Sequence, residues 1–191
     1  MTHADLVRRA CEWLASSTMK MHAVVPELST WGTREIPDVL GFRAEHRAWA
    51  GIANHTRVVV TLVECKVSRA DFQADKGKPW RKTPALGMGE LRWYFAPEGI
   101  LRREDMPPGW GLAECRARGV RKVVLPRPHL QHNEAEAFAL LVAAMRRVCC
   151  PSVEFPPVHH VHTTGVTHSW GPATCLGFEP RAPRCAAGGS R

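Results

Sequence analysis

The sequence lacks any apolar run long enough to cross a membrane. Its longest such runs, 58–63 and 137–145, fall far short of the roughly 18 residues that a spanning helix needs. The first turns carry Asp5, Arg8 and Arg9, and they contain no apolar stretch of the kind found in a secretory signal. We therefore expect a cytoplasmic protein with no membrane partner.

Cysteine pairs with the CxxC spacing are also missing. The seven cysteines are an odd number and include no CxxC pair, which argues against both a complete disulfide framework and a zinc ribbon. Residue types that bind zinc do gather near the C-terminus, but their spacing fits no standard site, so a histidine-rich tail is favoured over a zinc site there. These residues are His159, His160, His162, His168, Cys149, Cys150 and Cys175.

Length and composition fit one ordinary domain with a tail. The 191 residues are 45% apolar and 23% charged, values close to globular averages. Beyond position 150 proline, glycine and histidine are frequent and periodicity is lost. We therefore predict a domain over 1–150 and a flexible Pro/Gly/His-rich tail over 151–191.

The charge balance is strongly basic. Lysine and arginine total 26 against 18 acidic residues, which gives a net charge of +8. Such an excess attracts polyanions through counterion release, so nucleic acid is the leading partner. Charge that only maintains solubility is the alternative interpretation.

Hydrophobic periodicity predicts an α/β protein with a mixed sheet. The run 58–63 is continuously apolar rather than alternating, which is typical of a central strand buried on both faces. Ser68 is a good N-cap for a following helix, and a loop is predicted over 78–89. A stripe of apolar residues on the last helix should pack on the sheet: Ala137, Phe138, Leu141, Val142 and Met145. The predicted helices span 4–16, 69–76 and 134–148, and the predicted strands span 21–28, 36–42, 57–67, 92–96, 111–115 and 120–125.

Two acidic residues near the ends of predicted strands suggest a metal site. Asp38 follows Pro37, and Glu64 ends the buried strand, where an uncompensated charge is costly. Mg²⁺ prefers carboxylate oxygens, so Asp38, Glu64 and the backbone carbonyl of Cys65 could bind Mg²⁺ or Mn²⁺. Lys66 is two residues beyond Glu64 on the same face of the strand, where it could orient a nucleophilic water. Cys65 itself should point to the opposite face as an apolar filler.

These residues resemble the motif of a known superfamily. Pro37-Asp38 followed by Glu64-Cys65-Lys66, on the second and third strands after an opening helix, is similar to the PD-(D/E)xK nucleases. The segments 66–76 and 88–99, with Trp110-Gly111-Leu112, also resemble the short MmcB-like endonucleases of bacteria and phages. The resemblance covers residues 4 to about 125. It implies a restriction-endonuclease-like αβββαβ core with a central mixed sheet flanked by helices.

The resemblance also implies roles for single residues. Asp38 and Glu64 would bind the metal, and Lys66 would be the catalytic lysine. Glu35 matches an acid that some subgroups add to the site, and Glu12 on the first helix is a weaker candidate for that role. The insertion 45–56 and the tail 151–191 lie outside what the resemblance explains.

Basic residues follow the predicted catalytic strand. They could contact backbone phosphates, with Trp80 among them either stacking on a base or, more often for a tryptophan, packing in the core. Asp71 and Asp75 are explained by helix capping and surface pairing. Four cations on a predicted hairpin are either a solvated turn or a second phosphate contact: Arg116, Arg118, Arg121 and Lys122. The predicted DNA-contacting residues are Arg69, Lys76, Lys78, Arg81 and Lys82.

Two functional hypotheses follow. The first is a Mg²⁺- or Mn²⁺-dependent deoxyribonuclease that hydrolyses phosphodiester bonds in DNA. The second is a nucleic-acid-binding module that keeps the nuclease fold without turnover. An unrelated α/β protein with a surface Glu64–Lys66 pair is the structural alternative, and homodimer formation is left open.

Overall fold

The computed structural model describes residues 1–29, 34–49 and 52–149, with the side chains of 46–49 and 52–55 left out. The predicted tail 151–191 lies outside the described residues, as do the zinc-binding residue types within it. In the described part of the chain, no helix combines the length and the apolar character that crossing a bilayer requires.

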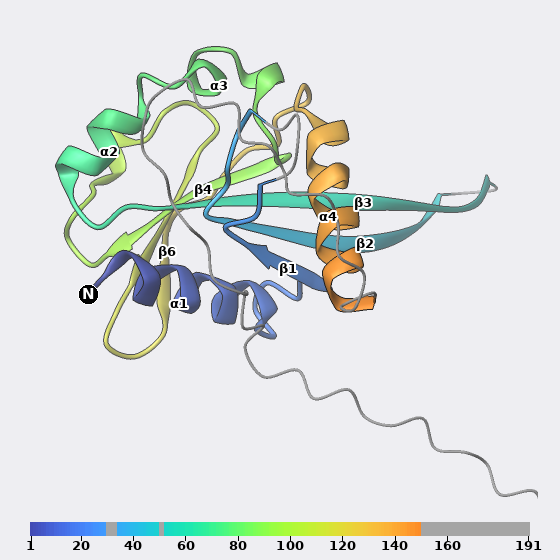
Figure 1. Cartoon of the computed structure of the whole chain (residues 1–191), viewed down its shortest axis with the longest axis horizontal. Helices are drawn as coiled ribbons and strands as arrows, with labels where there is room; N and C mark the ends of the chain where they lie inside the picture. The colour runs from blue at the N-terminus through green and yellow to red at the C-terminus, as the bar shows by residue number, and fades with distance from the viewer. Residues whose placement is uncertain (30–33, 50–51, 150–191) are drawn as a thin grey trace, which may run out of the picture. The chain divides into compact units, whose positions relative to one another are not determined.

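The core is a six-stranded mixed sheet (Figure 1). The strands are β1 (Ala23–Pro26), β2 (Val39–Trp49), β3 (Ile52–Cys65), β4 (Leu91–Pro97), β5 (Gly111–Cys115) and β6 (Val120–Val124), and they follow one another in the sheet in chain order. The pairs β3–β4 and β4–β5 are parallel, and the other neighbours are antiparallel. The predicted α/β class with a mixed sheet flanked by helices is confirmed.

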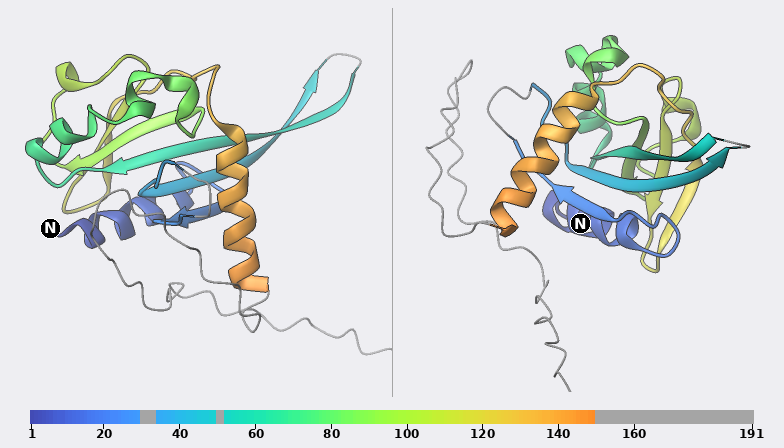
Figure 2. Two further views of the ribbon diagram at one scale, coloured as in Figure 1. Left: turned by 45° about the horizontal axis from the view of Figure 1, so that its top comes forward. Right: turned by 90° about the vertical axis from the view of Figure 1, so that its right-hand side faces the viewer.

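Helices cover both faces of the sheet (Figures 1 and 2). The helices are α1 (His3–Ala15), α2 (Arg69–Asp75), α3 (Pro79–Lys82) and α4 (Glu134–Cys149), with short 3₁₀ turns at Pro84–Leu86 and Arg103–Asp105. One buried cluster packs α1 on Val63 and Cys65 of β3. The other packs α2 and α4 on Val60 and Leu62. Because these β3 residues alternate along the strand, the two clusters lie on opposite faces.

Local sequence explains the helix starts. Thr2 and Asp5 form a capping box at α1, and the Ser68 hydroxyl accepts a hydrogen bond from the Asp71 N–H at α2, as predicted. Asn133 caps α4 through the Glu136 N–H. Pro79 occupies the first turn of α3, where its fixed φ suits a helix. The prediction of a loop over 78–89 was therefore wrong for this short helix and the 3₁₀ turn after it.

The predicted strands 36–42 and 57–67 stop short of the structure on the side of the insertion. Strand β2 continues to Trp49 and β3 begins at Ile52, so residues 45–49 and 52–56 extend the antiparallel pair from Glu45–Arg57 out to Trp49–Ile52. We call this extension the hairpin. Figure 2 shows this hairpin projecting past α4. On α4 the buried residues are Ala137 and Leu140, whereas Val142 and Met145 are exposed. The prediction is right for Ala137 and Leu141 and wrong for Val142 and Met145, because the face that packs on the core runs through Ala137, Leu140, Leu141 and Ala144.

Candidate active site

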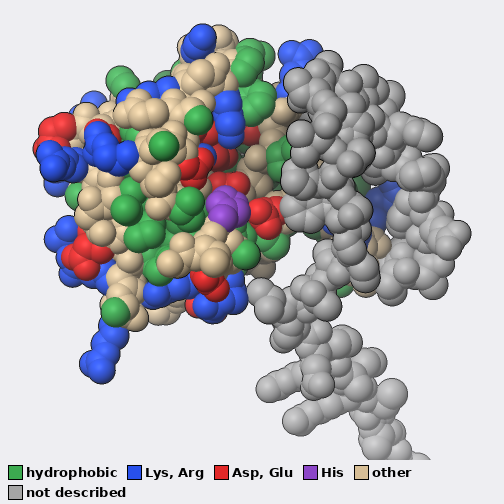
Figure 3. Space-filling model, turned by 60° about the vertical axis from the view of Figure 1, so that its left-hand side comes forward, with side chains coloured by type: hydrophobic (Ala, Val, Ile, Leu, Met, Phe, Trp, Pro, Cys, Tyr) green, Lys and Arg blue, Asp and Glu red, His purple; other side chains and the backbone are tan. Residues whose placement is uncertain are grey.

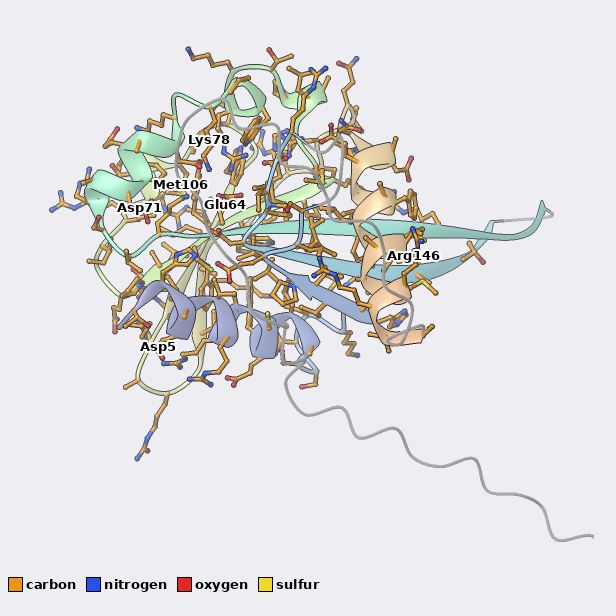
Figure 4. All side chains as sticks on the ribbon, in the orientation of Figure 1. Asp5, Glu64, Asp71, Lys78, Met106 and Arg146 are labelled. Atoms are coloured by element: carbon orange, nitrogen blue, oxygen red, sulfur yellow. The ribbon has the colours of Figure 1, made fainter. Side chains whose placement is uncertain are left out.

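The site forms where β3 ends and β2 begins. Antiparallel pairing of Val39 with Val63 brings Asp38 beside the end of β3. The Asp38 Oδ2 atom accepts a hydrogen bond of 2.6 Å from the backbone N–H of Cys65. Figure 4 shows Glu64 near the centre of the molecule, with Asp71 and Lys78 on the side of α2. The predicted proximity of the two strand ends is therefore present.

Glu64 and Lys66 lie together inside the protein. The Lys66 Nζ atom lies 3.2 Å from Glu64 Oε2, and the two side chains are only 5% and 1% exposed. Burial alone would lower the pKa of Lys66, but the carboxylates of Glu64 and Asp75 raise it above its usual value. Lys66 is therefore a cation in this site. Cys65 packs in the cluster on the opposite face, as expected.

Asp75 belongs to the site, contrary to its interpretation as a surface residue. Its side chain is 1% exposed and lies 3.3 Å from Lys66 Nζ, 2.7 Å from Lys78 Nζ and 2.6 Å from Arg81 Nε. The hydroxyl of Tyr94 donates a further hydrogen bond to it, 2.8 Å long. Burial favours the neutral acid, but the bonds from Arg81 and the charge of Lys66 hold its pKa well below the usual range.

Arg81 is placed differently from its prediction as a phosphate contact. Its side chain is 5% exposed and its nitrogens lie within 3.0 Å of carboxylate oxygens of Glu35, Glu64 and Asp75. Its guanidinium also lies 4.7 Å from the ring centre of Trp110. Arg81 therefore binds acids of the protein rather than facing solvent. We call Glu35, Glu64, Lys66, Asp75, Lys78 and Arg81 the inner cluster.

Glu35, predicted as an acid that some subgroups add to the metal site, lies in the inner cluster, where its carboxylate is paired with Arg81; its metal-binding role stays a prediction. It accepts hydrogen bonds of 2.7 Å from Arg81 Nη1 and from the backbone N–H of Met88. Burial and the charge of Glu64 nevertheless raise its pKa. Glu12, the other candidate acid, instead pairs with Arg8 on the exposed face of α1.

Asp38 also faces a second, more exposed group. The His3 Nε2 atom lies 3.6 Å from Asp38 Oδ1 and 3.2 Å from Glu27 Oε1. Burial and the nearby negative charge of Glu64 raise the pKa of Asp38 to about 7. Figure 3 shows a face of the molecule on which a histidine and acidic side chains gather, with lysine and arginine around them. We call His3, Glu27 and Asp38 the His3 group.

The other cations predicted to contact DNA differ in how far their side chains are paired within the protein. Arg69 makes two hydrogen bonds to Asp105, of 2.8 and 2.7 Å. Lys76 lies over the ring of Phe72, 4.8 Å from its centre, and Lys82 is exposed. Lys78 is 38% exposed although it contacts Asp75. Lysines at the rim are therefore the cations best placed for an external anion.

The oxygen atoms predicted to bind a divalent cation lie at the end of β3. Oε1 of Glu64 is buried and accepts no hydrogen bond from a described residue, although Arg81 Nη2 lies 3.0 Å away. Its negative charge is one cause of the raised pKa of Asp38. Asp38, Glu64 and the carbonyl of Cys65 supply the oxygen donors that Mg²⁺ and Mn²⁺ take. These are the donors predicted from the sequence.

Sequence reasoning missed Asp75 and Tyr94 as members of this site. One signal was available for Asp75: it lies three residues after Phe72, on the same buried face of α2. An acid on a buried helix face needs a partner, which could have directed attention to Lys66. The contact of Tyr94 depends on β4 pairing with β3 in register, with Glu64 opposite Tyr94.

The fold and the site together define an α/β protein with charged residues at the end of a central strand. Among solved structures, a protein of unknown function from Silicibacter pomeroyi is similar, with a TM-score of 0.52 and 18% sequence identity, over 81% of this chain and 97% of that one. At this identity the likeness concerns the fold alone. Comparison with protein-family profiles gives no match, and neither does comparison with curated proteins.

Proposed function

We propose that this protein is a metal-dependent endonuclease that hydrolyses phosphodiester bonds in DNA. The observation that carries the proposal is the meeting of Asp38, Glu64 and Lys66 at the end of β3, with Lys66 Nζ 3.2 Å from Glu64 Oε2. The resemblance of these residues to the PD-(D/E)xK motif supports the same reaction. The net charge of +8 suits a polyanionic substrate.

Each residue has a definable part in this reaction. Asp38 and Glu64 would hold Mg²⁺ or Mn²⁺, which supplies a water of lowered pKa and neutralises charge on the phosphate. Lys66 is held as a cation between Glu64 and Asp75, so its ammonium can orient the attacking water or stabilise the developing negative charge. Lys78 and Lys82 at the rim can contact the flanking phosphates.

The test is cleavage of labelled DNA by the full chain in Mg²⁺ and in Mn²⁺. Linear, nicked, branched and single-stranded substrates should all be included. Glu64→Gln keeps the side-chain size and should lose most cleavage. Glu12→Gln makes the same chemical change on the exposed face of α1 and should cleave like wild type. Equal cleavage by the two variants would exclude Glu64 from the reaction.

A second candidate function has its own supporting observation. Lys66, Lys78 and Arg81 already lie within 4.0 Å of the buried carboxylates of Glu64 and Asp75. An acid cluster compensated in this way can be stable without a metal, which favours a nucleic-acid-binding module without turnover. DNA binding in gel shifts, combined with no cleavage of any substrate in either metal, would support this alternative.

A further inference from the structure

The His3 group has the composition and the spacing of a metal site. It combines one imidazole nitrogen and two carboxylates, and one ligand atom from each residue lies within 4.8 Å of the others. The exposed fractions of the side chains are 41% for His3, 34% for Glu27 and 18% for Asp38. Solvent can therefore reach the group, and water can complete a coordination shell.

The backbone fixes these three residues from separate segments. His3 is the first residue of α1, where the capping box of Thr2 and Asp5 sets its position. The backbone N–H of Glu27 donates a hydrogen bond of 2.9 Å to the carbonyl of Asp38. Glu27 has a φ of 37°, a left-handed conformation that few residues other than glycine adopt. These backbone contacts therefore hold the main chain of the three residues close together.

Charge distinguishes this group from the inner cluster. The acids of the inner cluster are compensated by Lys66, Lys78 and Arg81. Within the described residues, by contrast, no lysine or arginine nitrogen lies within 4.0 Å of the Glu27 or Asp38 carboxylate, and His3 is the partner of both. Two carboxylates that share one imidazole favour the approach of an external cation.

We propose that His3, Glu27 and Asp38 bind a divalent transition-metal ion, separate from the cation expected between Asp38 and Glu64. The two Asp38 oxygens point to different neighbours, since Oδ2 accepts from the Cys65 N–H while Oδ1 lies toward His3. An imidazole suits Zn²⁺ and the later transition metals better than Mg²⁺, and Mn²⁺ accepts the same mixed donors. This site does not depend on nuclease activity.

The test measures binding of metal alone by the full chain in the absence of DNA. Zn²⁺ is titrated calorimetrically into wild type, His3→Gln and His22→Gln. His22 is an exposed histidine outside the group, so it is the matched control, and the histidines of 151–191 contribute equally to all three proteins. We expect His3→Gln to lose one binding event or to bind at least tenfold more weakly at that site, with His22→Gln unchanged.

A second readout identifies the ligand directly. Substoichiometric Mn²⁺ should broaden the imidazole NMR signal that is missing in His3→Gln, and the same signal should broaden in Glu64→Gln. Excess Mg²⁺ should displace Mn²⁺ from this site only poorly, so most of the broadening of the His3 signal should remain. Unchanged Zn²⁺ binding by His3→Gln, or a His3 signal unaffected by Mn²⁺, would overturn the proposal and leave His3 as a hydrogen-bonding partner only. Neither result depends on cleavage, so this test and the nuclease test fail independently.

Discussion

Arg81 Nη1 lies 2.7 Å from Glu35 Oε1, and this ion pair joins α3 to the segment that precedes β2. The same guanidinium lies within 3.0 Å of Glu64 and Asp75. One short helix therefore compensates three acids that come from three different parts of the chain. The stability of the site and that of α3 are linked through this side chain.

Arg81→Met should destabilise the protein strongly, because it leaves three buried carboxylates without their main cation. Removing one partner of a buried ion pair typically costs about 3–5 kcal/mol. The measurement is urea unfolding followed by tryptophan fluorescence. Arg69→Met removes an arginine whose side chain is 51% exposed and paired with Asp105, so it should cost no more than about 1 kcal/mol. Equal losses in the two variants would contradict the role of Arg81.

The stability of the metal-free protein should fall as the pH rises from about 4 to about 7. The pKa of Asp38 is raised to about 7 in the folded state, so the folded protein holds this proton more tightly than the unfolded chain does. The stabilisation is full at low pH and is lost as Asp38 ionises, with each unit of pKa difference worth about 1.4 kcal/mol. The raised pKa of Glu35 also makes the protein less stable as the pH rises, whereas the lowered pKa of Asp75 makes it more stable.

The contribution of Asp38 can be isolated by subtraction. Unfolding free energies of wild type and Asp38→Asn are measured in EDTA across this pH range. The difference between the two unfolding free energies should change with pH, because Asp38 titrates and the asparagine amide does not. Glu35 and Asp75 are present in both proteins, so their contributions cancel in the difference. A difference that is constant from pH 4 to 8 would show that the pKa of Asp38 is not raised.

Divalent metal should stabilise the wild-type protein at neutral pH. A ligand that binds only the native state adds about 2.7 kcal/mol when its free concentration is a hundred times its dissociation constant. Asp38→Asn removes a donor charge that both proposed metal sites share, so metal should stabilise this variant much less than it stabilises wild type. Thermal melts with and without millimolar Mg²⁺ or Mn²⁺ measure both gains. Equal gains would exclude Asp38 as a metal ligand.

Tyr94 gives a spectroscopic test, because it is the single tyrosine of the chain. Burial and the neighbouring Asp75 raise its pKa above the usual value of about 10. The native protein should therefore show no tyrosinate absorbance at alkaline pH until it unfolds. Its free energy of unfolding should decline once the pH exceeds the pKa that Tyr94 has in the unfolded chain. The control is the same titration in concentrated guanidinium chloride, where the phenol should ionise near its usual pKa. Ionisation at that pH in the native protein would contradict the buried bond to Asp75.

Much of the fold could be predicted because its signals are local. Ser68 begins a helix by capping it, and the continuous run from Val58 marked the central strand. The hairpin 45–56 could not be recognised because the resemblance to known nucleases offered no counterpart for it. The stripe on α4 was misassigned at Val142 and Met145 because this helix is apolar on more than one face, and helical spacing alone did not decide which of these faces packs on the core.

The site was predictable only in part for a related reason. Asp38, Glu64 and Lys66 follow a motif, and the strand pairing that unites them follows from the predicted order of elements. Arg81 was interpreted as a surface cation because neighbouring basic residues suggested it. Its actual partners are Glu35, Glu64 and Asp75, and the contacts that unite them form only when α2, α3 and the segment before β2 pack on the end of β3. Buried charges find partners through tertiary structure, so composition alone cannot assign them.

The register of β2 on β3 has a consequence for the length of the hairpin. The pair Val39–Val63 sets Asp38 against Cys65 at one end, while Trp49 pairs with Ile52 at the other. Residues removed in equal numbers from the two strands near the tip would leave the first of these pairs unchanged. The hairpin can therefore differ in length between homologous chains, or be shortened in an engineered chain, without changing the distance between the acids at its base.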